Sequence, residues 1–163
     1  MQTVIKTATR VGKYVDTKHV DNVIRNYKQE RWIHNSDRIG KEDSLSMWWS
    51  IDEMEDFIVE AKSQGADGLK FYFGAYGEDY KETPEYAGRQ TLVMVGTKEA
   101  QTALGIKNKD IYMQTPNGTN ILAYNRGTLC PPNCGPSKPI PDFDEDILGI
   151  TIIDRGDKGM LVF

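Results

Sequence analysis

Residues 50–76, SIDEMEDFIVEAKSQGADGLKFYFGAY, contain the pattern that decides the fold. Ser50 and Glu53 are spaced as a capping box, in which each side chain satisfies a backbone N–H at the start of a helix. Gly65 marks the end of that helix, and the aromatic-rich run LKFYFGAY after Gly68 favours a strand. The expected buried stripe of the helix consists of Met54, Phe57, Ile58 and Ala61. The stretch therefore predicts a helix followed by a strand.

The acidic residues of this helix have a structural explanation. They lie in its first turns, where the helix dipole favours negative charge, so they need no catalytic role. Trp49 before the cap and Met54 after it have the spacing of a hydrophobic staple. The acidic residues are Asp52, Glu53, Glu55 and Asp56.

The flanking sequence completes an α+β pattern. Residues 17–32 carry one apolar stripe at helical spacing (Val20, Val23, Ile24 and Tyr27), and residues 34–46 read as a polar connector. Further strands are expected in TLVMVGT, in a hairpin IYMQT-PNG-TNILAY that turns at Asn117-Gly118, and in a last pair, ILGITIID and GMLVF. Because helices precede strands, we expect N-terminal helices packed on one face of a mostly antiparallel sheet.

Length and composition indicate one soluble domain. The 163 residues are 39% hydrophobic and 27% charged, and no apolar run approaches the roughly 18 residues of a membrane span. We therefore expect a single domain over residues 1–163 and no membrane association. The N-terminus shows no apolar core or cleavage site of a signal peptide, so we expect a cytoplasmic protein with reduced thiols.

The net charge of −4 is unevenly distributed. Residues 1–46 carry nine Lys and Arg against six Asp and Glu, whereas the remainder carries eleven against eighteen. The basic residues of the first helix, Arg25 and Lys28 among them, either form a solvated helix surface or bind an acidic partner surface. Nucleic-acid binding through Lys13, Lys18, Arg25, Lys28 and Arg31 is disfavoured by the acidic remainder.

The segment CPPNCGPSKPIP, residues 130–141, holds both cysteines and five of the seven prolines. Cys130 and Cys134 supply only half of a four-ligand zinc site, so we expect no metal. A disulfide across this turn is geometrically feasible, and the spacing leaves the redox state of the pair open. We interpret the segment as a proline-stiffened structural crossing.

The acidic run PDFDEDILG has the D-x-D-x-D spacing of a calcium loop at Asp142, Asp144 and Asp146. An EF-hand loop needs Gly at its sixth position and Glu at its twelfth. Ile147 and Ile153 occupy those positions, so the run is interpreted as a solvated turn. Arg155-Gly156-Asp157 is likewise interpreted as turn chemistry.

A tyrosine-rich acidic loop follows the first strand and is the main candidate binding surface. Tyrosine offers a large contact area at a small entropic cost; the alternative is that these side chains cover loop backbone. The surface candidates are Tyr76, Tyr80, Tyr86, Glu78 and Asp79, together with Arg25 and Lys28.

WWSIDEMEDFIVEAKSQGADGLKFYFGAYGE, TLVMVGT and CPPNC together resemble a family of small Bacteroidota proteins of no known activity. The resemblance covers roughly residues 44–134. It implies a bacterial, non-membrane protein of α+β type and supplies no catalytic residues.

These patterns favour a small non-enzymatic interaction module that binds a protein partner or a second copy of itself, without a cofactor. No nucleophile–base pair or metal-ligand set is present in the sequence. The alternative is a hydrolase-like enzyme whose carboxylates, Tyr and Arg meet only in the fold, with Glu78, Asp79 and Tyr80 beside Arg31 or Arg38. The reaction, ligand, partner and oligomeric state are not encoded in these patterns.

Overall fold

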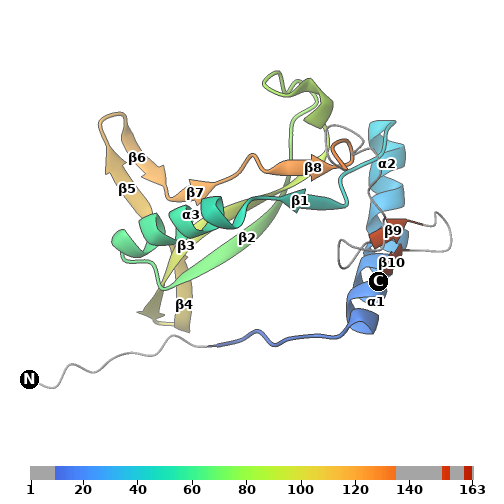
Figure 1. The fold of residues 1–163 in the computed structure, drawn as a ribbon. Helices are drawn as coiled ribbons and strands as arrows, with labels where there is room; N and C mark the ends of the chain where they lie inside the picture. Colours follow the sequence, from blue (N-terminus) through green and yellow to red (C-terminus); the bar gives the residue numbers. More distant parts are fainter. Residues whose placement is uncertain (1–9, 135–151, 155–159, 163) are drawn as a thin grey trace, which may run out of the picture. The chain divides into compact units, whose positions relative to one another are not determined.

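The computed structural model describes residues 10–134, 152–154 and 160–162, and it has the expected α+β class (Figure 1). The helices are α1 (Thr17–Tyr27), the π-helical turn η1 (Lys28–Trp32), α2 (Ile33–Ile39), α3 (Ile51–Ser63) and the 3₁₀ turn η2 (Pro84–Tyr86). The strands are β1 (Ser46–Trp48), β2 (Gly68–Ala75), β3 (Gln90–Thr102), β4 (Gly105–Asp110), β5 (Tyr112–Thr115), β6 (Gly118–Ile121), β7 (Ala123–Tyr124), β8 (Thr128–Cys130), β9 (Ile152–Asp154) and β10 (Met160–Val162).

The chain divides into two compact units, each built from separate segments. The first, here called the sheet unit, comprises Met1–Val11, Met47–Tyr76 and Gln90–Thr128. The second, the helical unit, comprises Gly12–Ser46, Gly77–Arg89 and Leu129–Phe163. Two compact units can still unfold in a single transition. The division therefore does not decide whether the chain is one domain, and the single domain expected from the sequence stays a prediction.

The capped helix predicted from residues 50–65 is confirmed as α3. The Ser50 hydroxyl accepts a hydrogen bond from the Glu53 backbone N–H at 3.1 Å, and the Glu53 carboxylate accepts one from the Ser50 N–H at 3.0 Å. Phe57 and Ala61 of the expected stripe are buried, and Met54 and Ile58 are half-buried. The helix ends at Ser63, two residues before Gly65, whose φ is 85°. Trp49 and Met54 both pack against the core; their direct contact as a staple stays a prediction.

The central sheet has the order β2-β3-β4, with β7 also paired to β3, and all of these pairings are antiparallel. β4 was not predicted. It is joined to β3 by a turn in which Thr102 pairs with Gly105, and the same arrangement recurs where Thr115 pairs with Gly118. In each turn the threonine hydroxyl donates to the glycine carbonyl, at 2.7 and 2.8 Å, and the glycine has a positive φ.

The predicted hairpin over residues 111–124 is confirmed, but its turn lies one residue earlier than expected. Pro116 and Asn117 occupy the turn, and only Gly118 has a positive φ, of 112°. Proline fixes φ at a value suited to the first central position of a type I turn, and a left-handed glycine then follows as a bulge. Asn117 therefore needs no positive φ.

α3 supplies the helical layer that covers one face of the central sheet. Figure 1 shows α3 lying along β2 and β3. The buried cluster between them consists of Phe57 and Ala61 from α3, Met94 from β3, and Leu122. Gly96 of β3 leaves room for this contact, because a Cβ at that position would lie 2.7 Å from Leu122 Cδ2. The expected packing of helices on one face of an antiparallel sheet is therefore confirmed for α3; for α1 and α2, which belong to the helical unit, it stays a prediction.

In the helical unit, the polar connector expected over residues 34–46 is wrong for its first part. The helix continues from α1 through η1 into α2 and ends at Gly40, which has a φ of 68°. The chain that follows is held by the helix, because the Asn35 amide donates to the Asp43 carboxylate at 3.0 Å and the Trp32 indole donates to the Asp43 carbonyl at 2.7 Å. The residues of α2 are mostly polar and show no apolar residues at helical spacing, which is why this part of the helix was not predicted.

The remaining strands form two short ladders. β1 pairs with β8. β9 and β10 pair antiparallel, with Leu161 opposite Ile153, which confirms the last strand pair expected from the sequence. Arg155-Gly156-Asp157 and the acidic run from Asp142 to Asp146 lie outside the described residues.

Candidate interaction surface

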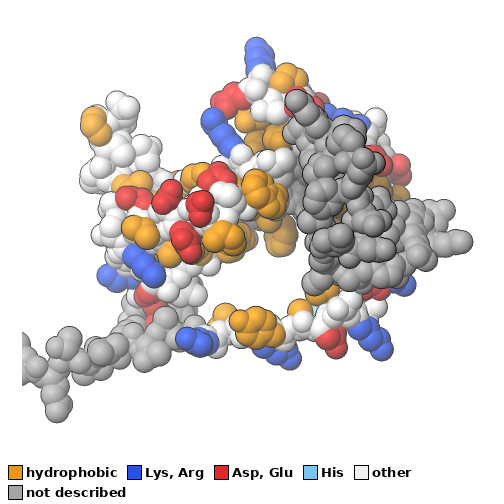
Figure 2. All heavy atoms as spheres, viewed as in Figure 1, with side chains coloured by type: hydrophobic (Ala, Val, Ile, Leu, Met, Phe, Trp, Pro, Cys, Tyr) orange, Lys and Arg blue, Asp and Glu red, His pale blue; other side chains and the backbone are white. Residues whose placement is uncertain are grey.

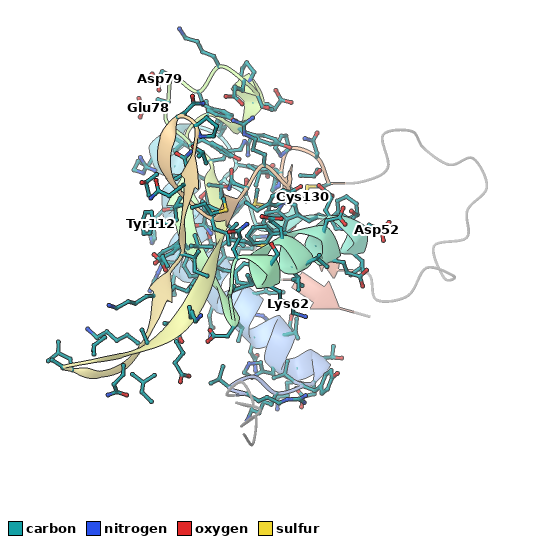
Figure 3. The ribbon with its side chains drawn as sticks, turned by 90° about the vertical axis from the view of Figure 1, so that its left-hand side faces the viewer. Asp52, Lys62, Glu78, Asp79, Tyr112 and Cys130 are labelled. Carbon is teal, nitrogen blue, oxygen red and sulfur yellow. A yellow bond between two sulfur atoms is a disulfide. The ribbon has the colours of Figure 1, made fainter. Side chains whose placement is uncertain are left out.

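The predicted tyrosine loop is divided between the two units. Tyr76 belongs to the sheet unit, where its hydroxyl donates to Asn125 Oδ1 at 2.8 Å. Glu78, Asp79 and Tyr80 belong to the helical unit. Figure 3 shows Glu78 and Asp79 at the outside of their loop, and both are exposed. These two carboxylates are therefore accessible to a partner.

Tyr86 and Lys28 were expected on the surface, and that expectation is wrong for both. Tyr86 is buried, and its hydroxyl accepts hydrogen bonds from Leu129 N at 3.3 Å and from Asn133 Nδ2 at 3.1 Å. Lys28 is buried with its ammonium 5.2 Å from the centre of the Trp32 ring. Tyr86 anchors the chain around β8, and Lys28 lies over the Trp32 ring of its own helix.

Arg25 is half-buried, and its guanidinium pairs with Asp21 one helical turn earlier. A charge neutralised within its own helix attracts an external anion less strongly. Of the seven surface candidates, Glu78 and Asp79 are the two that are exposed.

Cys130 and Cys134 form a disulfide, with their Cα atoms 4.7 Å apart. The expectation of reduced thiols in this segment is therefore wrong, and the question left open by the spacing is answered. The covalent link closes the first part of the proline-rich segment; residues 135–141 of that segment lie outside the described residues. Within the described residues there is no group of three or more His, Cys, Asp or Glu side chains arranged to hold a metal.

Sequence reasoning missed one accessible apolar feature of the sheet unit, the outer edge of β2. β2 pairs with β3 along one edge, and no other described strand pairs with it. Phe71 is 48% exposed and Phe73 is 82% exposed, and Ile51 at the start of α3 is 73% exposed. The run LKFYFGAY predicted a strand, but nothing local in it indicated that the strand lies at an edge.

The register shows which backbone groups of β2 point outward. Gly96 N donates to Leu122 O and Gly96 O accepts from Ile111 N, so the even-numbered residues of β3 bond away from β2. Paired residues of antiparallel strands alternate between hydrogen-bonded and non-hydrogen-bonded positions. Because Leu69 pairs with Gly96, Phe71 with Met94 and Phe73 with Leu92, the N–H and C=O groups of Leu69, Phe71 and Phe73 point to the open edge.

A surface hollow of about 260 Å³ lies between α3 and the first part of β2. It is mainly apolar, and its lining residues are Ile58, Ala61, Lys62, Ala66, Asp67, Gly68 and Leu69. Sites for small organic ligands have volumes of about 300–1,000 Å³. The hollow lies just below that range and has room for an apolar side chain.

The solvent side of α3 is acidic. The helix carries five acidic residues against one lysine. Figure 2 shows Asp and Glu side chains gathered over α3 with hydrophobic side chains beside them, and Figure 3 shows Asp52 and Lys62 at opposite ends of the helix. The groove between α3 and the β2 edge thus has an apolar floor, with Lys62 and Asp67 at the hollow and acidic residues toward the N-terminal end of α3.

The opposite face of β2 carries a polar network. Lys70 Nζ donates to Asp110 Oδ1 at 2.6 Å, and Tyr72 Oη donates to Asp110 Oδ2 at 2.8 Å. The hydrogen bond from Lys70 is the main reason why the pKa of Asp110 is lowered, and the hydrogen bond to Asp110 is the main reason why the pKa of Lys70 is raised. This network ties β2 to β4 across β3.

These opposite pKa shifts predict a bell-shaped contribution to stability. The contribution of Asp110 is present above its ordinary pKa of 3.8 and is lost as the pH falls through its lower folded value. The contribution of Lys70 is present below its ordinary pKa of 10.5 and is lost as the pH rises through its higher folded value. We expect Lys70→Met to lower the thermal midpoint at neutral pH and to lose this effect at both extremes. Lys109→Met is the control, because Lys109 is exposed; an equal, pH-dependent loss there would contradict the assignment.

Comparison with known proteins supplies no relative for this chain. No family model, no curated protein and no solved structure matches it. None of the helices in the described part of the chain has the length and apolar character that crossing a bilayer requires.

Proposed function

We propose that this protein is a non-enzymatic interaction module that binds a protein partner through the face formed by α3 and the β2 edge. The observation that carries the proposal is the pair Phe71 and Phe73, two exposed aromatic side chains on an edge strand beside an apolar groove. Large aromatic residues are enriched at protein interfaces. An unpaired strand edge is also a ready template for another chain.

Site-specific photo-crosslinking tests the proposal. A benzophenone amino acid is placed at Phe73 and, as the matched control, at Ile106 of β4, which is 64% exposed. We expect one discrete protein adduct from position 73 and none from position 106. Equal labelling from both positions, or no adduct from position 73, would contradict the proposal.

The partner can also be a second copy of the chain, and sedimentation velocity separates the two cases. A monomer across a hundredfold range of concentration, combined with a heterologous adduct at position 73, indicates a separate partner. A concentration-dependent dimer that Phe73→Ser abolishes indicates a homo-oligomer through the same face.

The cellular compartment is the second part of the proposal. The sequence favours the cytoplasm, whereas the Cys130–Cys134 disulfide is typical of an oxidising compartment. Thiol alkylation in intact cells distinguishes them. Alkylated cysteines would place the protein in the cytoplasm, and cysteines that react only after reduction would place it in an oxidising compartment. Membership in the Bacteroidota family suggested by the sequence motifs is likewise a proposal.

A further inference from the structure

We propose that the partner contributes an extended segment that pairs antiparallel with β2, with an apolar side chain in the hollow beside Leu69 and an Arg or Lys beside the acidic N-terminal part of α3. The inference rests on the proposed function and adds the chemistry of the partner. Strand addition of this kind takes affinity from main-chain hydrogen bonds and specificity from pockets for alternate side chains.

The backbone provides the first step of the argument. The outward N–H and C=O groups of Leu69, Phe71 and Phe73 recur at every second residue, as an antiparallel partner strand requires. Partner residues opposite these three form hydrogen-bonded pairs with them. Paired residues of antiparallel strands direct their side chains to the same face of a sheet, so the partner side chains opposite these positions face α3.

The side chain opposite Leu69 meets the hollow. Ile58 and Ala61 of α3 and Leu69 of β2 line it, and its volume of about 260 Å³ leaves room for an apolar side chain. Burying such a side chain in an apolar site contributes favourably in proportion to the area removed from water. We therefore infer Leu, Ile, Val or Met at this partner position.

The charged residues of α3 on the side of β2 favour a partner side chain of a particular charge. Ile58 and Lys62 line the hollow on the β2 side, whereas Glu53 reaches Tyr124 of β7 on the other side, with a distance of 3.1 Å between Glu53 Oε1 and Tyr124 Oη. Glu55 lies seven residues before Lys62 and so shares its flank, whereas Glu60 lies seven residues after Glu53 and shares the opposite flank.

Two interactions favour an Arg in the partner at the position opposite Phe73. It lies near the N-terminal, acidic part of α3, because β2 returns antiparallel to α3 after the turn at residues 64–67. It also covers the exposed Phe73 ring, where a guanidinium gains a cation–π contact. From its N-terminus, the partner strand therefore reads Arg, then two positions later an apolar residue, then two positions later an apolar residue for the hollow.

A second copy of this chain fits the groove less well than a separate partner does. Two β2 strands paired about a two-fold axis keep the same sheet face upward, which brings the two α3 helices to the same side. Each helix carries five acidic residues and one lysine. The two helices therefore carry net charges of the same sign, which repel each other. A second β2 strand also contains no Arg that could lie opposite Phe73.

The probe is the peptide Thr-Arg-Thr-Val-Thr-Leu-Thr-amide, which carries a fluorophore on its N-terminal amine and is titrated by fluorescence anisotropy. Its Arg, Val and Leu are placed opposite Phe73, Phe71 and Leu69. Phe71→Pro removes the outward N–H while leaving the bonds to β3, since proline is tolerated on an edge. Phe71→Ala removes the side chain but keeps that N–H. We expect Phe71→Pro to bind about tenfold more weakly than Phe71→Ala, the loss of one hydrogen bond.

The control for the proline is Asn108→Pro on the outer edge of β4. Asn108 is exposed and pairs with Glu99, an odd-numbered residue of β3, so its N–H points away from β3. We expect wild-type affinity for this variant. Circular dichroism checks that each variant keeps its fold, and equal affinities of Phe71→Pro and Phe71→Ala would overturn the backbone pairing.

Charge exchange tests the second half of the inference. Glu55→Lys is expected to weaken binding of the Arg peptide about fivefold, and a peptide with Glu in place of Arg should recover that loss. Glu60→Lys on the opposite flank is expected to leave binding unchanged. Equal effects at the two positions would overturn the placement of the Arg.

Hydrogen exchange measured by NMR reports on the geometry directly. In the free protein the amides of Leu69, Phe71 and Phe73 should exchange faster than those of Lys70 and Tyr72, and the peptide should slow them selectively. Protection of those three amides without peptide, rising with protein concentration, would identify a second copy as the occupant and overturn the inference. A Phe73 adduct together with an unchanged exchange pattern would leave the proposed function standing and overturn strand addition alone.

Discussion

Replacing Phe57 with alanine is expected to lower the free energy of unfolding by about 3–5 kcal/mol. The side chain is only 7% exposed and lies at the centre of the cluster that joins α3 to the central sheet. Its ring stacks on Tyr124 of β7, with 5.4 Å between the ring centres and an interplanar angle of 28°. Truncation therefore removes a large buried area and an aromatic contact at once.

Urea denaturation followed by tryptophan fluorescence and far-UV circular dichroism measures the effect. The matched control is Val59→Ala on the same helix, because Val59 is 66% exposed; we expect a change within about 0.5 kcal/mol. Similar losses at both positions would contradict the placement of α3. Coincident transitions by the two probes would also confirm that the sheet unit and the helical unit unfold as one domain.

Local patterns were sufficient to predict α3 and β2. The reciprocal hydrogen bonds of Ser50 and Glu53, the stripe around Phe57 and the break at Gly65 depend on residues within one or two turns of each other. Such interactions are fully encoded in a short segment. Glu53 has the structural role that the capping box predicted, since the hydrogen bonds from Ser50 are the main reason why the pKa of Glu53 is lowered.

The pairing partners of each strand could not be predicted in the same way. β4 contains Lys107, Asn108 and Lys109, so it lacks the apolar alternation of a half-buried strand, and its Lys109 pairs directly with Lys98. β2 has the composition of a buried strand but lies at an edge. Whether a strand is central or at an edge depends on contacts distant in sequence, to which periodicity is insensitive.

The candidate site shows the same division. The sequence did not distinguish Tyr76, Tyr80 and Tyr86. Tyr86 is nevertheless buried, and its hydroxyl accepts hydrogen bonds from Leu129 and Asn133, which lie more than 40 residues away in the sequence. Glu78 and Asp79 were placed correctly at the surface because short acidic residues in a loop have few buried options. The groove beside β2 combines residues from two elements, and only the fold brings them together.

Gly127 is the position where the smallest substitution is expected to have one of the largest effects. A Cβ at this residue would lie 2.6 Å from Trp49 Cε2, 2.8 Å from Trp49 Nε1 and 2.7 Å from the Trp48 carbonyl oxygen. One of these neighbours is backbone and the others belong to a rigid indole that packs against the core. Neither can rotate away, so Gly127→Ala is expected to destabilise the protein by about 3 kcal/mol, the upper part of the range for overpacking.

Gly96→Ala is the control, because it creates a contact as close as that of Gly127→Ala but against a flexible side chain. Its Cβ would also come close to a neighbour, at 2.7 Å, but that neighbour is Leu122 Cδ2, the end of a flexible side chain. Leu122 can change rotamer, so we expect a loss of about 1 kcal/mol. Thermal unfolding of both variants, with the fluorescence maximum as a probe of Trp49, measures the difference. Equal losses would show that the Trp49 indole is free to move, and the close approach of Gly127 would then not be needed for the fold.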